Sequence, residues 1–92
     1  MIEQNLTNTM TETVTQTKSP LALATGAILR AARKRKHMTQ AELARRTGLS
    51  VRMIAYVESA DAVPTLATYL ALCRELNLDP APTLERITAR AV

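Results

Sequence analysis

Two side chains of this 92-residue sequence have the reactivity that catalysis or metal binding most often uses, and neither has a partner. His37 and Cys73 are the only histidine and the only cysteine, 36 positions apart. A zinc site needs three or four such ligands, so no metal site is predicted. Gly26 and Gly48 are too few and too far apart for a glycine-rich phosphate loop. We therefore predict a chain that is not an enzyme and uses no metal or other cofactor.

The residues around the second glycine have the spacing of two short helices that cross at a tight turn. Gly48 can take the positive φ of such a turn without steric cost. Ala44 is small enough to face a crossing helix, and Ile54 and Val57 lie three apart on one face of the next helix. This pattern predicts a helix-turn-helix, whose second helix can enter the major groove of DNA.

If Ile54 and Val57 face the core, the opposite face of that helix is free to contact bases. Arg52 can donate two parallel hydrogen bonds to guanine O6 and N7, and a phosphate contact is its alternative role. The predicted base-contacting residues are Ser50, Val51, Arg52, Ala55 and Tyr56.

Positive charge is concentrated on the same part of the chain. Residues 30 to 52 hold eight basic residues and one acidic residue, a net charge of +7 in a chain whose total is +4. Such a segment is typical of a phosphate-binding surface, although a solvated helix face is the alternative. Gln40 begins a predicted helix, where free N–H groups and the helix dipole attract a phosphate. The predicted phosphate-contacting residues are Gln40, Lys34, Arg35, Lys36 and Arg45.

Composition indicates a single all-α domain. The sequence has no Phe or Trp, so the core must consist of Leu, Ala, Ile, Val and Met, and no alternating run of Val and Ile suggests a strand in the central region. The longest apolar stretch, residues 21–29, is much shorter than the ~20 residues of a membrane span. The first residues lack the basic region of a secretory signal, so we expect a cytoplasmic protein without a membrane partner.

Helix caps divide the chain into four helices and a shorter fifth. The predicted N-caps are Ser19, Thr39, Ser50 and Thr65, with Glu42 reaching back to Thr39 in a capping box. Asp79-Pro80 and Pro82-Thr83 are competing starts for the last helix. The helix after Thr65 is expected to stop at Asn77, and its predicted buried face is Leu66, Tyr69, Leu70, Cys73 and Leu76.

Three parts are predicted along the chain. Residues 1–18, with threonine at every odd position from 7 to 17, form a tail that has too few apolar residues to fold and should be disordered. Because period two is strand spacing, a strand that pairs with a partner or a second protomer is the alternative. Residues 19–78 form the DNA-binding domain. Residues 79–92 are predicted to make a homodimer contact through the spare apolar surface at Leu78, Leu84, Ile87 and Val92.

Together these motifs resemble the Cro and phage-repressor type of helix-turn-helix, also called the xenobiotic-response-element family. The resemblance covers about residues 23–78. It is carried by Gly26-x-x-Leu29-Arg30-x-x-Arg33, Thr39-Gln-x-Glu-Leu-Ala44, Thr47-Gly-Leu-Ser50, Ile54-x-x-Val57-Glu58, Pro64 and the Leu66-to-Leu78 helix with its exit. The resemblance implies a compact four- to five-helix lambda-repressor-like domain. It also implies an ion pair between Arg33 and Glu58.

The family contains repressors, activators and antitoxins. The resemblance therefore implies a sequence-specific double-stranded DNA-binding transcriptional regulator, a repressor, that acts as a homodimer. The alternative is a HipB-like antitoxin that neutralises a toxin protein and regulates its own operon.

Three features depart from the family pattern. Ser59-Ala60 replaces a basic residue and glycine, and Asp61-Ala62 replaces two basic residues, so the Lys34–Lys36 cluster is expected to supply phosphate contacts in place of this loop. A base-reading Gln or Asn is absent from residues 51–55.

Overall fold

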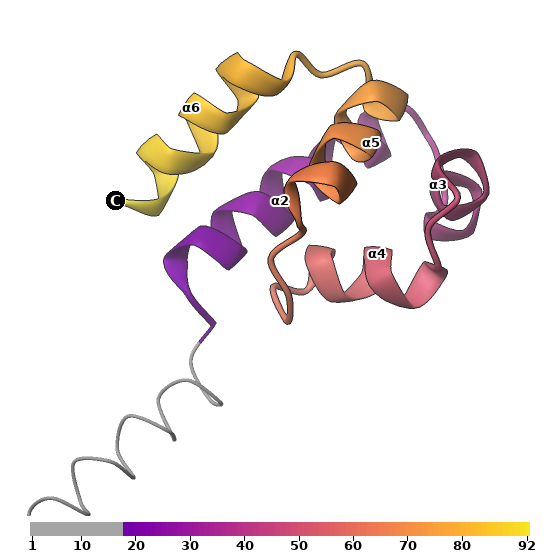
Figure 1. Cartoon of the computed structure of the whole chain (residues 1–92), viewed down its shortest axis with the longest axis horizontal. Coiled ribbons are helices and arrows are strands. Elements are labelled where there is room, and N and C mark those ends of the chain that lie inside the picture. The colour runs from indigo at the N-terminus through magenta and orange to yellow at the C-terminus, as the bar shows by residue number, and fades with distance from the viewer. Residues whose placement is uncertain (1–17) are drawn as a thin grey trace, which may run out of the picture.

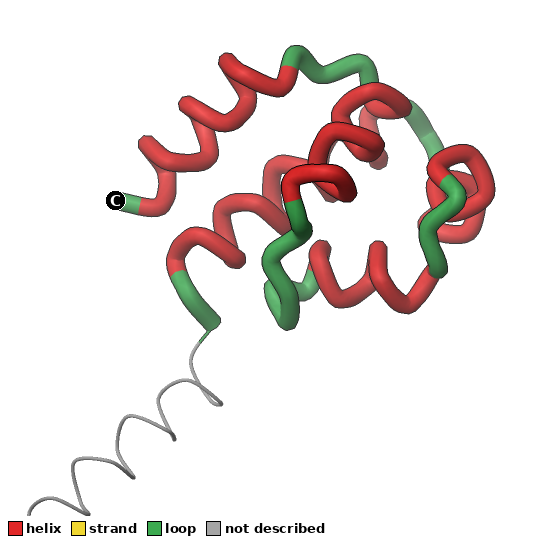
Figure 2. Tube along the Cα trace, in the orientation of Figure 1, coloured by secondary structure: helices red, strands yellow, loops and turns green. Residues whose placement is uncertain are grey.

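A computed structural model describes residues 18–92, so the predicted Thr-rich tail, apart from Lys18, lies outside the described residues. Five helices and no strand occupy that part of the chain: α2 (Pro20–Arg35), α3 (Gln40–Thr47), α4 (Val51–Glu58), α5 (Leu66–Leu76) and α6 (Pro80–Ala91). The helix α2 runs between α6 on one side and α4 on the other (Figure 1, Figure 2). The predicted all-α fold is confirmed.

Side-chain caps begin four of the five helices. The hydroxyls of Ser19, Thr39, Ser50 and Thr65 each accept a hydrogen bond from the backbone N–H three residues later, as predicted. The Glu42 carboxylate does not complete the capping box and instead accepts from Arg46 at 3.1 Å. The last helix begins at the first of its two competing starts, with Pro80 in its first turn, and Asp79 makes no side-chain cap.

The same four helices end at residues in the left-handed backbone conformation. Gly48 has φ of 80°, as the predicted turn requires, and its N–H bonds the Ala44 carbonyl at 2.9 Å. The backbone of His37 (φ 57°), Ala60 (67°) and Asn77 (57°) also has positive φ, at the ends of α2, α4 and α5. These three ends have the paired hydrogen bonds of a Schellman motif. Three residues that carry side chains therefore have a backbone conformation that favours glycine.

The core has two parts, which share α2 and α5. One part lies under the helix-turn-helix and contains Leu29, Ala32, Met38, Leu43, Ala44, Ile54, Val57, Leu72 and Leu76. The other joins α2, α5 and α6 and contains Ala24, Ile28, Tyr69, Cys73 and Ile87. The Tyr69 hydroxyl also donates to the Pro80 carbonyl at 2.7 Å, which ties the start of α6 to α5.

A glycine in the middle of α2 permits close packing against α4. A Cβ built at Gly26 would lie 2.5 Å from the Val57 carbonyl oxygen and 2.8 Å from that of Glu58. Both atoms belong to backbone, which cannot rotate away as a side chain could. Gly26 therefore sets how closely the end of α4 approaches α2.

Two predicted burial patterns are wrong in part. Tyr69, Cys73 and Leu76 are buried as expected, but Leu66 is 70% exposed and Leu70 43% exposed, while Leu72 is buried in their place. Leu70 follows Tyr69 by one position, which turns it about 100° from the buried stripe. Leu66 lies in the first turn of α5, beyond the packed part of the stripe.

Ile87, predicted to be spare dimer surface, is fully buried between α2, α5 and α6.

Candidate nucleic-acid interface

The two crossing helices are α3 and α4, and their buried faces hold them to the rest of the domain. Leu43 and Ala44 of α3 and Ile54 and Val57 of α4 are each at most 5% exposed. The connection between the helices is only three residues long and includes Gly48. Because both ends of α4 are capped and its inner face is packed, its outer face is presented on a rigid element.

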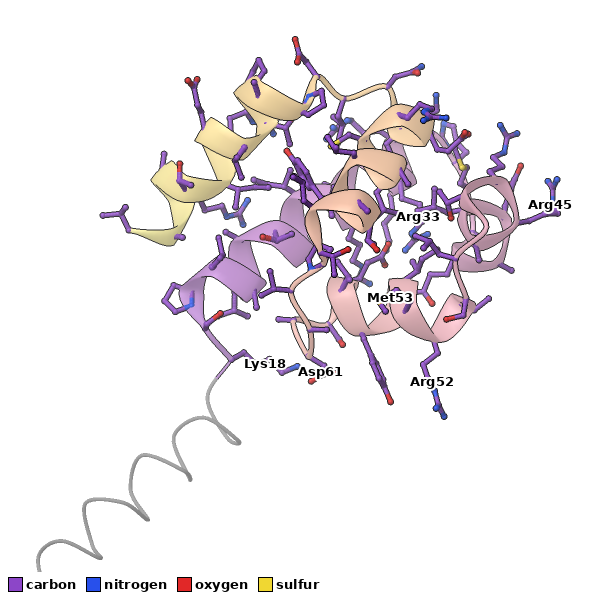
Figure 3. All side chains as sticks on the ribbon, viewed as in Figure 1. Lys18, Arg33, Arg45, Arg52, Met53 and Asp61 are labelled. Carbon is purple, nitrogen blue, oxygen red and sulfur yellow. The ribbon has the colours of Figure 1, made fainter. Side chains whose placement is uncertain are left out.

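That outer face carries the side chains predicted to contact bases. Ser50, Val51, Arg52 and Tyr56 are exposed and Ala55 is half-buried. The Arg52 guanidinium lies over the Tyr56 ring, 5.9 Å from its centroid, and the Arg52 side chain projects away from the helix bundle (Figure 3). The Ser50 hydroxyl also accepts from the Met53 N–H, so its own hydrogen is left to donate. The surface has apolar, cationic and hydroxyl groups suited to base edges.

Behind α4, a buried ion pair fixes the helix to α2. Arg33 donates from Nε to Glu58 at 2.7 Å and from Nη2 at 2.9 Å, and the two side chains are only 9% and 5% exposed. The remaining guanidinium nitrogen, Nη1, donates to the Met38 carbonyl at 2.7 Å. The hydrogen bond to Glu58 raises the pKa of Arg33 above its ordinary value. The structure therefore brings Arg33 and Glu58 together in bidentate geometry.

Gln40 shares the same carboxylate. Its Nε2 donates to Glu58 Oε1 at 3.0 Å, which uses one of its two amide hydrogens and leaves the other free for a phosphate. The side chain is thus held at the N-terminus of α3 by the ion pair behind it. This pre-ordering reduces the conformational entropy that Gln40 would lose on contact with DNA.

The predicted basic residues lie at the surface of two helix ends. Lys34, Arg35 and Lys36 are exposed at the end of α2. Arg45 is exposed on α3, where it projects outward, and lies 3.8 Å from the Glu42 carboxylate (Figure 3). Charges at these positions remain available to DNA phosphates because exposed ion pairs are weak and easily exchanged.

The family model described as helix-turn-helix matches residues 29–82, which is more than half of the chain and contains the whole α3–turn–α4 unit. The chain belongs to the Cro and phage-repressor type of helix-turn-helix proteins. It is accordingly a DNA-binding transcription regulator. No curated protein and no solved structure is similar enough to count as a match.

One candidate DNA contact of this helix-turn-helix protein was missed from sequence. Arg30 is exposed on α2 and lines a cleft of about 430 Å³ together with Gln40 and Tyr56, which lie on α3 and α4. Arg30 lies three residues before Arg33, and only the packing of α2 against α4 shows that it lines the same cleft. Met53 is a second exposed residue not predicted, on the flank of α4.

The remaining reactive groups lie away from this surface. Cys73 is fully buried beside Tyr69, and burial raises the pKa of its thiol, so it behaves as the predicted core side chain. Within residues 18–92, no three His, Cys, Asp or Glu side chains are grouped closely enough to hold a metal ion. None of the helices described is long and apolar enough to cross a membrane.

Proposed function

We propose that this regulator recognises a specific double-stranded DNA operator as a homodimer and acts as a repressor in the cytoplasm. The observation that supports this proposal is the exposed Arg52–Tyr56 face of α4, whose opposite face is fully packed. Repression needs only that the bound protein occlude a promoter, whereas activation needs a further contact with the transcription machinery. We propose no enzymatic activity for the chain.

In the proposed complex, two sets of contacts do different work. Base contacts by Ser50, Val51, Arg52, Ala55 and Tyr56 give sequence preference, because hydrogen-bond patterns in the major groove differ between base pairs. Phosphate contacts by Gln40, Lys34, Arg35, Lys36 and Arg45 fix the position of α4 and carry no sequence information.

The experiment that tests this assignment selects bound fragments from random DNA and then compares variants on the preferred site and on scrambled DNA. Arg52→Ala should weaken binding to the preferred site by about 1–3 kcal/mol and leave scrambled DNA nearly unaffected. Lys34→Ala should weaken both by similar amounts. Equal losses on both DNAs from Arg52→Ala would reduce that residue to a phosphate contact. Failure to enrich any sequence would overturn specific recognition.

Homodimerisation is supported by an apolar surface outside the proposed DNA contacts. The apolar groove, of about 230 Å³, lies between α2, α5 and α6 and is lined by the exposed side chains of Leu21, Val63, Leu66 and Leu84. One recognition helix reads only a few base pairs, so two half-sites about one DNA turn apart are needed for useful specificity. Val63 belongs to the loop that leaves α4, so the groove borders the loop that follows the recognition helix.

An antitoxin is the second candidate function, and the same apolar groove favours it because a toxin protein could bind there. The two candidates differ in genetic context: an antitoxin gene is transcribed together with a gene for a toxin, such as a kinase or a ribonuclease. Copurification of the neighbouring gene's product with this chain would support the antitoxin. Absence of such a gene would leave the operator-binding repressor.

A further inference from the structure

Asp61, in the loop that leaves α4, carries a negative charge at the edge of the proposed DNA surface. The Lys18 ammonium lies 3.3 Å from Asp61 Oδ1 and also donates to the Ser59 carbonyl, and the Lys18 and Asp61 side chains meet (Figure 3). The Ser59 hydroxyl donates to Asp61 Oδ2 at 2.6 Å. Hydrogen bonds from Ser59 and Lys18 hold the pKa of Asp61 below its ordinary value, so the carboxylate is ionised at neutral pH.

The same carboxylate faces a group of hydrogen-bond donors across the 430 Å³ cleft. Arg30, Gln40, Tyr56 and Asp61 all line this cleft. Arg30 is exposed, and its guanidinium forms no salt bridge with another residue of the 18–92 segment. Gln40 keeps one free amide hydrogen, and the exposed Tyr56 hydroxyl is a further donor. A phosphate entering the cleft would meet these donors and also the negative charge of Asp61.

We propose that this cleft binds one backbone phosphate of DNA, with Arg30 supplying the positive charge and Lys18 cancelling the repulsion from Asp61. The inference rests on the proposed function, since the phosphate is that of an operator. It adds Arg30 to the Lys34–Lys36 cluster as a replacement for the basic residues that the family pattern has in this loop. Charges that line one cleft interact with a phosphate bound in it, because the Debye length is about 10 Å at 0.1 M salt.

The test measures the affinity of full-chain variants for a selected DNA site by fluorescence anisotropy between 50 and 200 mM salt. Arg30→Gln should weaken binding about threefold to tenfold and reduce the salt slope by about 0.9, the contribution of one phosphate. Lys18→Gln should weaken binding less, and Asp61→Asn should strengthen it. In the Asp61→Asn background, Lys18→Gln should weaken binding by a similar factor, because the potential of the Lys18 charge at the phosphate adds to that of Asp61 and does not depend on it.

The opposite signs separate an electrostatic role from a structural one. If the Lys18–Asp61 pair only held the loop in place, Asp61→Asn would weaken binding as Lys18→Gln does, and the neutralising role would be overturned. If Lys18 contacted a phosphate directly, Lys18→Gln would reduce the salt slope by about 0.9, as Arg30→Gln should, and the neutralising role would again be overturned.

Arg90→Gln is the matched control for loss of one positive charge, because α6 lies on the far side of α2 from α4 (Figure 1). It should change neither affinity nor salt slope. Wild-type affinity in Arg30→Gln would overturn the cleft proposal while operator binding stands. Absence of DNA binding by the wild-type chain would overturn the proposed function itself and the cleft with it.

Discussion

Arg33 joins three segments of the chain through one buried guanidinium. It holds the end of α4 through Glu58 and the turn after α2 through the Met38 carbonyl, and Glu58 in turn holds Gln40 of α3. All buried side-chain polar atoms of residues 18–92 have a hydrogen-bond partner. A buried charge is costly without such partners. The recognition helix and the predicted phosphate contact are therefore positioned by the same pair.

Breaking this pair should cost more stability than breaking an exposed one. Arg33→Met and Glu58→Gln should each destabilise the domain by about 3–5 kcal/mol, because each leaves a buried group without its partner. In urea unfolding, the double variant should lose clearly less than the sum of the two. The exposed pair of Arg46 and Glu42 is the control, for which coupling of about 0–1 kcal/mol is expected. Additive losses at Arg33 and Glu58 would show that the two side chains are not coupled in solution.

At the scale of helices, the predicted N-caps are confirmed except for the Glu42 half of the capping box, whereas features that depend on how helices pack are only partly predicted. The N-caps, Gly48 and the ends of α3 and α4 depend on neighbouring residues, so the sequence was enough to predict them. The exposure of Leu66 and the burial of Ile87 depend on which helix covers which face. Arg30 and the contact of Lys18 with Asp61 likewise require α2 to lie beside α4, which no local pattern specifies.

The close packing of α2 against α4 at Gly26 predicts that one added methyl group changes the stability of the domain strongly. Alanine is favoured over glycine by about 1 kcal/mol in a helix interior, yet Gly26→Ala should destabilise the domain by about 1–3 kcal/mol. The reason is that the added Cβ meets the Val57 and Glu58 carbonyls. Displacement of α4 should also weaken DNA binding. Thermal unfolding and anisotropy measure the two effects.

Gly48→Ala is the matched comparison for Gly26→Ala. Nothing lies within 4 Å of its added Cβ, so only the positive φ opposes the change, with a cost of about 1–2 kcal/mol. A stabilising Gly26→Ala would mean that the helices can separate without loss.

At the ends of three helices, replacing a residue of positive φ by glycine is the reverse of Gly48→Ala. His37 is exposed in the left-handed conformation at the end of α2, so His37→Gly should stabilise the domain by about 0.5–1 kcal/mol in urea unfolding. Relief of the left-handed conformation, about 1–2 kcal/mol, exceeds the entropy that glycine adds to the unfolded chain. Asn77→Gly should gain less, because asparagine tolerates this conformation. Destabilisation by His37→Gly would indicate that its imidazole makes a stabilising contact.

The whole molecule has a proposed DNA surface and an apolar groove, and its C-terminal helix completes the second part of the core. Ile87 and Thr83 of α6 are buried, so deletion of residues 80–92 would open the core and could not report on dimerisation alone. Single surface substitutions in the apolar groove are therefore the appropriate probes. The alternative that the Thr-rich tail is a strand that pairs protomers is tested separately by a chain that starts at Lys18 and retains the contact with Asp61.

Charge placed in the apolar groove should separate the protomers. Leu66→Glu combined with Leu84→Glu should shift sedimentation from dimer to monomer, because two carboxylates per protomer would be desolvated in the interface. Affinity for a two-half-site operator should fall sharply, while affinity for a single half-site should not change. Leu23→Glu is the control, since Leu23 is exposed on α2 but does not line the groove. The chain starting at Lys18 should remain dimeric. If that chain became monomeric while the doubly substituted chain stayed dimeric, the tail would be the pairing segment and the groove would have another occupant.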